Sequence, residues 1–323
     1  MAVMNIYAAG GAATNIVKKF VKYNKKKSEG FAEIVTYFLD TSKSNMDENI
    51  PEDQCYFLDG LDGSGKLRSS NYDALKECSK EILHKFKPAD VNVIVNSASG
   101  GTGSTLSPIL VNELLSRNEL TIVITIGSTG SRKETENTVK TLKSYEVISK
   151  KTEMPVAMYY RENSVDKPRQ KVDAEIETAL ILIAAIFSGE NRELDMSDLK
   201  NFINYHKVTT FTPKLNLLDF FSKDIVLRKG ESLVSLTTLV DENTSSHVDI
   251  LTEYQATGFL PDSSKKNISV ELPIHACIVS GYFIPVVEQL ESKLKSYDEV
   301  RKTVVEKTIV SDISDATDEG VIL

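Results

Sequence analysis

Short apolar runs rich in β-type residues alternate with amphipathic runs through the first half of the chain. This pattern predicts strands at 3–7, 34–39, 56–58, 91–95, 120–126 and 156–160, and helices at 15–23, 73–86, 106–115 and 134–149. Strands separated by helices form βαβ units in a mostly parallel sheet, so we expect the α/β class. In such a sheet a ligand lies in the loops beyond the carboxyl ends of the strands.

A long helix is predicted at 170–187. Its first half is amphipathic, with Val172 and Ile176 one turn apart, and its second half, 179–187, is apolar on nearly every side. A helix of that kind is buried on most of its surface. We therefore predict a long central helix that lies between two domains.

Beyond residue 205, turn-rich stretches separate shorter runs. The pattern predicts strands at 231–240 and 268–279 and a helix at 286–294, which indicates a second, α+β domain. Residues 311–323 carry four carboxylates and few apolar side chains, so we expect a disordered acidic tail. The predicted divisions are a ligand-binding sheet domain at 1–168, the central helix and the loop after it at 169–204, the α+β domain at 205–297, and the C-terminal segment with its tail at 298–323.

Composition narrows the class of protein. The net charge of −8 argues against direct nucleic-acid binding through a basic surface. The three cysteines form no CxxC pair and the histidines show no ligand spacing with them, so neither disulfides nor a zinc site is expected, as in a reducing cytoplasm. The most apolar stretch, 178–187, is too short to span a bilayer and the start lacks a basic n-region, so we expect a soluble protein with no membrane partner.

The strongest local signal is the loop Ser97–Ser104, which follows a predicted strand and opens a predicted helix. Its glycines let the backbone approach a phosphate, and the helix start offers free N–H groups and a positive dipole end. Ser99, Thr102 and Ser104 add hydroxyl donors. The alternative is a tight turn with a serine N-cap. Because Gly10 and Gly11 also lie between a strand and a helix, two such loops at one sheet edge favour a polyphosphate ligand.

A third glycine cluster, 60–66, matches the pattern GxxxxGK. Leu67 stands where a P-loop needs Ser or Thr to bind magnesium, and leucine is no metal ligand. A dinucleotide enzyme of the Rossmann type is a further alternative, because Asp40 follows the second strand, although residues 10–13 lack the GxGxxG spacing. Both alternatives, each acting as a monomer that does not polymerise, stay open on the residues alone.

The run Gly100-Gly101-Thr102-Gly103-Ser104 resembles the glycine-rich signature loop of tubulins, with Ser99 and Thr105 in place of its flanking glycines. A longer pattern agrees with this resemblance. A Gly-Gly loop that ends in Asn15 comes first, then the signature loop, then the long helix, and then Asp195-Met196-Ser197-Asp198. This is the order found in the tubulin and FtsZ superfamily, whose synergy loop carries DxxD. Segments 156–164 and 193–202 are similar to PhuZ-type phage tubulins. Ala13 and Glu193 depart from the family pattern, which has Gly and Asn there.

This resemblance implies a tubulin-like fold that binds GTP or GDP, with Mg²⁺ held through phosphates and water. The first glycine loop would lie along the phosphates or base, the third loop near the γ-phosphate, and the signature loop around the α- and β-phosphates. Glu136 would meet the ribose, while Asn163 and Asp173 would face guanine. The implied nucleotide-binding residues are Gly10, Gly11, Asn15, Gly63, Ser64, Gly65, Ser99, Gly100, Gly101, Thr102, Gly103, Ser104, Glu136, Asn163 and Asp173.

Asp195 and Asp198 have two interpretations. By spacing alone they form an N-terminal cap for a helix predicted at 199–205. The resemblance instead implies catalytic carboxylates that orient water at the nucleotide of the next subunit. It therefore implies a GTPase that assembles head to tail into filaments in the cytoplasm of a phage-infected bacterium, where they position phage DNA compartments or capsids, with capsid or phage nucleus components as partners. The acidic tail either binds a neighbouring subunit or only solubilises the chain.

Overall fold

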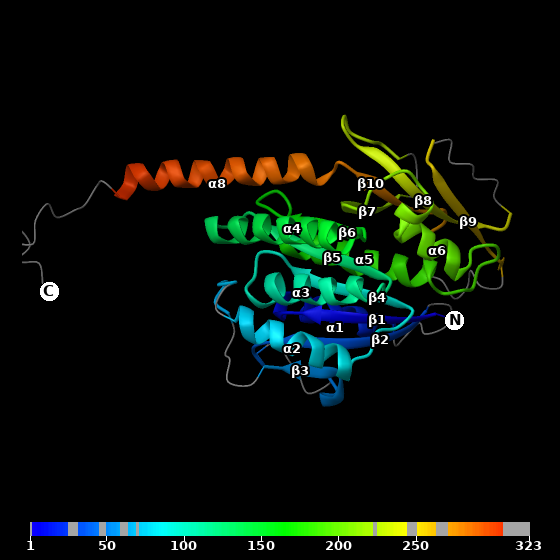
Figure 1. The fold of residues 1–323 in the computed structure, drawn as a ribbon, viewed down its shortest axis with the longest axis horizontal. Coiled ribbons are helices and arrows are strands. Elements are labelled where there is room, and N and C mark those ends of the chain that lie inside the picture. Colours follow the sequence, from blue (N-terminus) through cyan, green and yellow to red (C-terminus); the bar gives the residue numbers. More distant parts are fainter. Residues whose placement is uncertain are drawn as a thin grey trace, which may run out of the picture.

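The computed structural model describes residues 2–24, 32–44, 50–58, 64–68, 71–221, 225–243, 251–262 and 271–305. One ten-stranded sheet runs through them in the order β3-β2-β1-β4-β5-β6-β7-β10-β8-β9 (Figure 1). The predicted α/β class with a mostly parallel sheet is thus confirmed. The strands are β1 (Val3–Ala9), β2 (Glu33–Asp40), β3 (Cys55–Phe57), β4 (Val91–Ser97), β5 (Thr121–Ser128), β6 (Val156–Asn163), β7 (Leu215–Phe221), β8 (Ser232–Asp241), β9 (Tyr254–Leu260) and β10 (Ile274–Ser280).

The strands β1 to β6 are all parallel to their neighbours. Their carboxyl ends therefore share one side of the sheet, which we call the carboxyl edge. Each helix that follows one of these strands begins at this edge and runs back along the sheet. The helices are α1 (Gly11–Asn24), α2 (Tyr72–Lys85), α3 (Thr102–Ser116), α4 (Arg132–Thr152), α5 (Arg169–Ile186), α6 (Met196–Ile203) and α8 (Phe283–Val305), with short 3₁₀ turns η1 (Glu52–Gln54) and η2 (Tyr205–Lys207).

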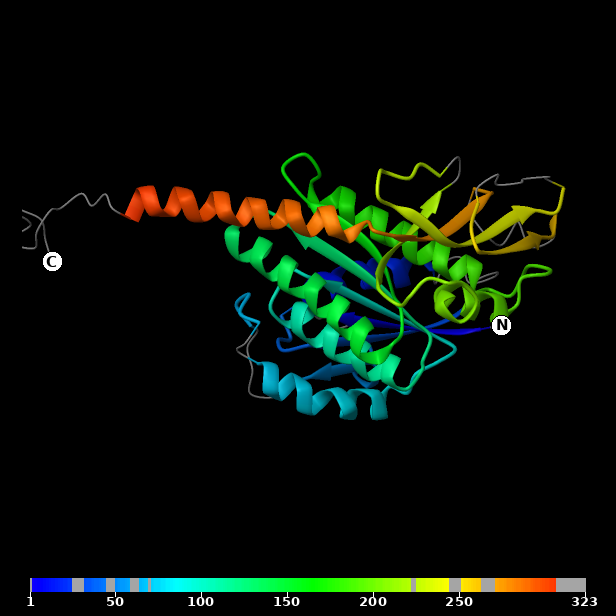
Figure 2. The same ribbon diagram turned by 45° about the horizontal axis from the view of Figure 1, so that its top comes forward.

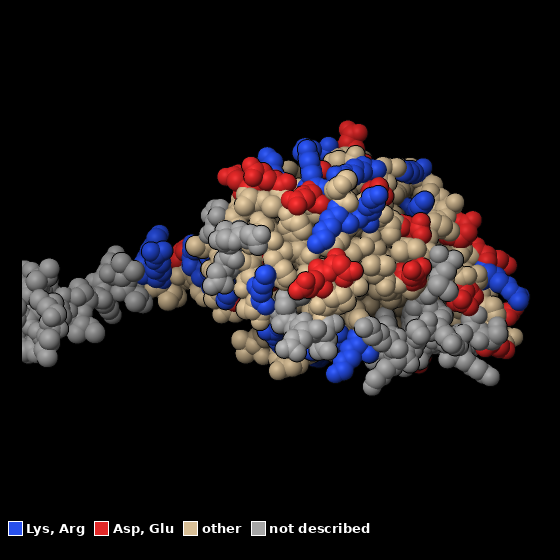
Figure 3. All heavy atoms as spheres, turned by 90° about the horizontal axis from the view of Figure 1, so that it is seen from below, with Lys and Arg blue, Asp and Glu red and all other residues tan. Residues whose placement is uncertain are grey.

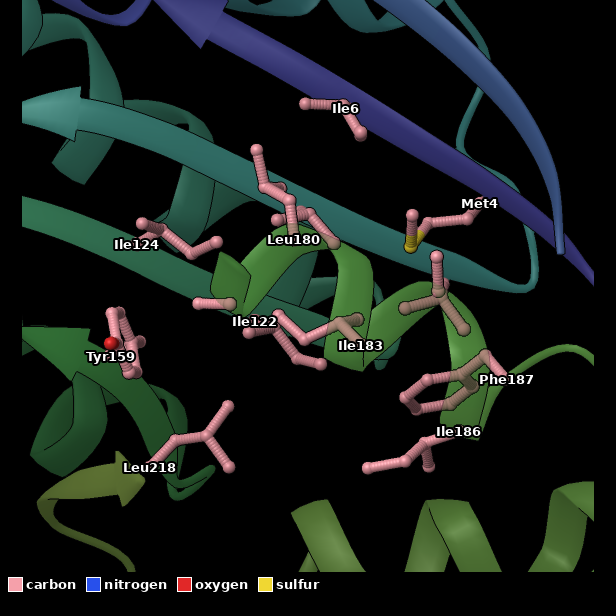
Figure 4. Close-up of a cluster of buried hydrophobic side chains, with 14 of the residues drawn as sticks. Met4, Ile6, Ile122, Ile124, Tyr159, Leu180, Ile183, Ile186, Phe187 and Leu218 are labelled. Atoms are coloured by element: carbon pink, nitrogen blue, oxygen red, sulfur yellow. The ribbon is translucent and has the colours of Figure 1, made fainter. Parts of the chain in front are cut away.

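Helices cover both faces of the sheet (Figures 1 and 2). The alternation of side chains along each strand divides the core in two. On β1, Met4 and Ile6 pack with α1 and α5, whereas Tyr7 belongs to the core beneath α2, α3, α4 and α8. Figure 4 shows Leu180 and Ile183 of α5 among the side chains of the first of these cores. Burial on both faces explains why the central strands are apolar almost throughout.

Two predicted helices begin earlier than the apolar pattern indicated. The helix predicted from residue 15 begins at Gly11, and the helix predicted from residue 106 begins at Thr102. Glycine has low helix propensity, so the pattern assigned these first turns to loops. The glycine-rich segments therefore present helix N-termini directly at the carboxyl edge.

The second half of the chain extends the same sheet. β7 pairs in parallel with β6, from Val156 opposite Leu215 to Met158 opposite Leu217, and β10 then lies antiparallel between β7 and β8. The sequence pattern missed β7 and β9. It also began the last strand too early, because Pro273, just before β10, has no N–H for a ladder. The domain boundaries stay a prediction, since the sheet is continuous across them.

The predicted central helix is confirmed as α5. Nine of its residues are buried, and near its end Ala184 accepts a backbone hydrogen bond from Ala32 at 3.2 Å. Its 18 residues span about 27 Å at 1.5 Å per residue. Helix α5 thus carries the chain from the carboxyl edge to the opposite edge of the sheet.

Helix α8 lies along α4 and projects past the carboxyl edge (Figures 1 and 2). Arg132 Nε lies 2.7 Å from Asp298 Oδ1, and Lys143 Nζ lies 2.6 Å from Glu291 Oε1. The predicted acidic tail lies outside the described residues. Among the helices of the described ranges, none has both the length and the apolar content to cross a bilayer.

Candidate functional site

The two glycine loops touch at the carboxyl edge. Gly10 has a φ of +83°, and a Cβ added there would lie 3.0 Å from the amide nitrogen of Gly103. A Cβ added at Gly103 would lie 2.7 Å from the carbonyl oxygen of Ala9. A Cβ at 2.7 Å from backbone is essentially never seen, and Gly10 combines a tight approach with a positive φ, so both positions favour glycine. The loop after β1 and the loop after β4 therefore form one continuous backbone surface.

The segment before α2 lies on this surface. A Cβ added at Gly101 would lie 2.3 Å from Cβ of Ser64, so the glycine lets the two segments meet. The Thr102 hydroxyl lies 3.1 Å from that of Ser64 and 2.7 Å from that of Thr41. Gly65 has a φ of +50° and faces open space. Gly63 lies outside the described residues.

The chemistry of this edge fits a polyphosphate. Helices α1 and α3 both begin here, and neither has an acidic residue in its first turn. Their first N–H groups have no partner within the helix and lie at the positive end of its dipole, which together favour an anion. Thr14 Oγ1 is buried and makes no hydrogen bond within the described part of the chain.

Asn137 of α4 fixes the signature loop from behind. Its Nδ2 donates to the carbonyl oxygens of Lys66 at 2.9 Å, Ser99 at 3.1 Å and Gly100 at 3.3 Å. The Ser104 hydroxyl donates to the Gly100 carbonyl at 2.6 Å. These hydrogen bonds hold the loop backbone against α4. Sequence analysis missed Asn137, because nothing in its local pattern links it to a loop 38 residues away.

An ion pair crosses the site. Lys66 Nζ lies 2.5 Å from Oε1 of Glu134, and Oε2 of Glu134 accepts a hydrogen bond from the Ser128 hydroxyl at 2.7 Å. Burial tends to raise the pKa of the Glu134 carboxyl, but the hydrogen bonds from Lys66 and Ser128 outweigh it, so the pKa lies below its usual value. Glu134 is therefore a carboxylate at neutral pH.

Glu136, the residue expected at the ribose, takes part in a different cluster. It forms ion pairs with Arg132, Lys133 and Lys140. The structure brings Glu134, not Glu136, together with the segment before α2. The sequence pattern did not single out Glu134, which lies in the first turn of a helix that begins at Arg132 and is capped by Ser131.

Three residues expected at or near the base, Asn15, Asp173 and Asn163, lie on α1, on α5 and at the end of β6. Lys19 of α1 pairs with Glu177 of α5 at 3.8 Å. Both helices run back from the carboxyl edge, so Asn15 and Asp173, each four residues earlier, lie one turn nearer that edge. Asp173 is 7% exposed, with Arg169 Nε 3.5 Å from its carboxylate.

Asn163 ends β6 beside the start of α5. Its side-chain oxygen is buried and makes no hydrogen bond within the described residues. A buried amide oxygen without a partner is costly in a folded protein. It is thus a candidate acceptor for a ligand at this edge, alongside the Asp173 carboxylate.

Asp195 and Asp198 lie at the other end of the molecule. Asp195 is the N-cap of α6: its Oδ1 accepts from the amides of Ser197 at 2.7 Å and Asp198 at 3.0 Å. Oδ2 of Asp198 accepts from the Asp195 amide at 3.1 Å, which completes a capping box. The capping geometry expected from the spacing is present. Asp195 is exposed, and its Oδ2 makes no hydrogen bond to any described residue.

These acids do not join the glycine loops within one chain. Helix α5 begins beside Asn163 and ends nine residues before Asp195, so about 27 Å of helix separates the two groups. The structure therefore assembles the phosphate-binding features at one edge and leaves the acidic pair at the opposite edge.

A model of the Tubulin/FtsZ family, GTPase domain, matches residues 4–174, just over half of the chain. The chain belongs to the Tubulin/FtsZ family. Membership assigns a GTPase domain to residues 4–174 and implies GTP or GDP as its ligand. It also favours the tubulin interpretation over the P-loop and dinucleotide alternatives. The structure adds a reason against a P-loop, because no helix follows Lys66 directly and α2 begins only at Tyr72.

Among curated proteins, the chain is 28% identical over 214 residues to a phage tubulin-like protein of Pseudomonas phage phiKZ. That match spans 62% of this chain and 63% of the relative, which is less than two thirds of the relative's length.

Two solved structures share the fold. A TubZ protofilament from bacteriophage PhiKZ superposes with a TM-score of 0.83 at 22% identity, covering 96% of this chain and 95% of that one. The phage tubulin PhuZ with GDP superposes at 0.84 and 17% identity, covering 96% of each chain. The expected tubulin-like fold is thereby confirmed.

Proposed function

We propose that this protein is a phage tubulin: a GTPase that assembles head to tail and hydrolyses GTP between subunits. One observation carries the proposal. The phosphate-binding loops and the acidic pair Asp195 and Asp198 lie at opposite ends of α5, about 27 Å apart along the helix axis. A complete site then needs the carboxyl edge of one subunit and the acidic edge of the next.

At the carboxyl edge, the N-termini of α1 and α3 and the glycine loops hold the phosphates of GTP. Asp173 and Asn163 face guanine, since a carboxylate accepts from both N1–H and the exocyclic amine. When bound, Mg²⁺ would be held through the phosphates and water and would neutralise part of the negative charge on the phosphates. Asn15 keeps its proposed role along the phosphates or base, whereas a ribose contact by Glu136 requires it to exchange its ion pairs with Arg132, Lys133 and Lys140.

At the acidic edge, Asp195 has an exposed carboxylate whose Oδ2 is not used within the described chain. A carboxylate in that state accepts a hydrogen bond from water and orients it for attack. The capping box holds the other oxygen in place through the amides of Ser197 and Asp198. The cap and the catalytic role are therefore compatible, because they use different oxygens of one residue.

A contact between two different edges of one subunit type is heterologous, and such contacts form open filaments wherever the rotation between subunits does not close a ring. Repetition of that contact gives an open filament. The PhiKZ protofilament, which shares this fold, supports the proposal.

As the matched relatives come from phages, we further propose that the filaments act in the cytoplasm of an infected bacterium. There they would position phage DNA compartments or capsids, with capsid or phage nucleus components as partners. Basic and acidic side chains are interspersed on the face seen in Figure 3. The net charge of −8 is the reason that no nucleic-acid partner is proposed, and no membrane partner is proposed either.

A mixing experiment tests the shared site. Light scattering and phosphate release are followed after addition of GTP and Mg²⁺ to wild type below its assembly threshold, to Asp195→Ala above it, and to the mixture. We expect little release from either sample alone, and clear release from the mixture, because wild-type subunits supply Asp195 to nucleotides held by variant neighbours. Release equal to the sum of the separate samples contradicts a site formed between subunits.

A further inference from the structure

The Lys66–Glu134 pair lies across the mouth of the phosphate-binding surface. Lys66 belongs to the segment before α2, and Glu134 belongs to the first turn of α4. Between these elements lies the signature loop that precedes α3. The pair therefore joins two segments that flank the same glycine-rich backbone.

The backbone of Lys66 is held by its neighbours, whereas its side chain is half exposed. Its carbonyl accepts from Asn137 at 2.9 Å, and its amide nitrogen lies 3.3 Å from the position of a Cβ on Gly101. The side chain, by contrast, is 53% exposed, and within the described residues its ammonium pairs with Glu134 alone. A long flexible ammonium on a fixed backbone can change partners without moving the loop.

The residues around Lys66 favour a phosphate as a second partner for its ammonium group. The preceding Ser64 hydroxyl contacts Thr102 at the start of α3, where a polyphosphate fits. Nearby Arg68 is not available in the same way, because its guanidinium donates to Thr141 Oγ1 at 3.0 Å and Ser144 Oγ at 3.2 Å, behind the loop. A half-exposed ion pair such as Lys66–Glu134 is weak, so a phosphate with more negative charge competes with it.

We propose that Lys66 makes this site distinguish GTP from GDP. With GTP bound, Lys66 Nζ binds the terminal phosphate and leaves Glu134; with GDP bound, it stays with Glu134. Glu134 thus acts as a competitor that weakens triphosphate binding relative to diphosphate binding. The inference rests on the proposed function, because it requires that the carboxyl edge binds guanine nucleotides.

The test measures affinities for GDP and for a GTP analogue that is not hydrolysed, by calorimetry, at protein concentrations below the assembly threshold. The quantity compared is the ratio of the two affinities, because a contact to base or ribose affects both nucleotides and cancels. We expect Lys66→Gln to lower the preference for the triphosphate about five- to tenfold, and Glu134→Gln to raise it by about threefold or more. Lys66→Arg should retain most of the wild-type preference.

Lys133→Gln is the matched control, since it removes the same charge from the same region but from a lysine paired with Glu136. It should leave the ratio unchanged. If the two test variants shift the ratio in the same direction, or neither shifts it, Lys66–Glu134 is only a structural pair and the inference is overturned. If wild type binds neither nucleotide, the proposed function fails first, and the inference with it.

Discussion

The hydroxyl of Tyr254 donates a hydrogen bond to Oδ1 of Asp198 at 3.1 Å. Tyr254 begins the outermost strand, β9, so this contact ties the acidic edge to the rim of the sheet. Burial, together with the nearby Asp198 carboxylate, raises the pKa of Tyr254 to about 12, so the phenol keeps its proton and acts as a donor. Both oxygens of Asp198 are thus engaged, by Tyr254 and by the Asp195 amide, so in the proposed site Asp198 would position the loop and Asp195 would face water.

Tyr254→Phe should separate positioning from assembly. We expect phosphate release per assembled subunit to fall about three- to tenfold, since one hydrogen bond to a carboxylate is lost, while the assembly threshold stays within about twofold of wild type. Tyr56→Phe is the control, because it removes a similar tyrosine–carboxylate contact, to Glu81 at 2.8 Å, far from this loop. Equal rates in wild type and Tyr254→Phe would remove the positioning role.

Asp195→Asn should separate chemistry from folding. Asparagine is as good an N-cap as aspartate, so the melting temperature should stay within about 2 °C of wild type. Phosphate release should fall by about 100-fold or more, because a neutral amide is a poor water-orienting base. Asp195→Ala should lose activity as well and also about 1 kcal/mol of stability with the cap. An active Asp195→Asn protein would leave Asp195 as a cap only.

Two glycines of the signature loop should respond differently to alanine. At Gly103 a Cβ would lie 2.7 Å from the Ala9 carbonyl, whereas at Gly100 the nearest atom would be 3.9 Å away. We expect Gly103→Ala to lower the free energy of unfolding, measured in urea without nucleotide, by about 1–3 kcal/mol, and Gly100→Ala to change it by no more than about 0.5 kcal/mol. Similar values for both variants would mean that the close approach of the two loops is not required.

Asp173→Asn should change base preference. In the proposed site the carboxylate accepts from two N–H groups of guanine, whereas asparagine offers a donor that suits the extra carbonyl of xanthine. We expect GTP affinity to fall by about tenfold or more and xanthosine triphosphate affinity to rise by a similar factor. Asp166→Asn, a change of the same kind in the preceding loop, is the control. Loss of affinity for both nucleotides would indicate a structural role for Asp173.

The periodicity of apolar residues predicted most helices and strands of the fold, but it did not predict β7 and β9. The segment that forms β9 contains Gly258, which weakens a strand pattern. The structure shows why glycine is there, since a Cβ would lie 2.6 Å from the Asn191 side-chain oxygen. Such a requirement comes from packing between distant segments, and a local pattern does not carry it.

The candidate site was accessible from sequence only in part. Glycine loops at strand ends are local features, so their residues were named correctly as neighbours in the fold. Glu134 and Glu136 lie two positions apart on α4, which changes the facing direction by about 200° at 3.6 residues per turn, so the resemblance that named Glu136 carried no information on Glu134. Asn137 and Tyr254 act through contacts over tens of residues and left no local signal.

The separation of the two half-sites by α5 gives any filament of these subunits a built-in polarity. At one end the last nucleotide has no acidic loop above it, and at the other end an acidic loop has no nucleotide beneath it. With hydrolysis between subunits as proposed, each single strand of subunits holds one fewer complete hydrolytic site than it has subunits. The nucleotide at the exposed end then outlasts those inside, so a strand that grows at this end keeps a triphosphate at its tip until the next subunit arrives.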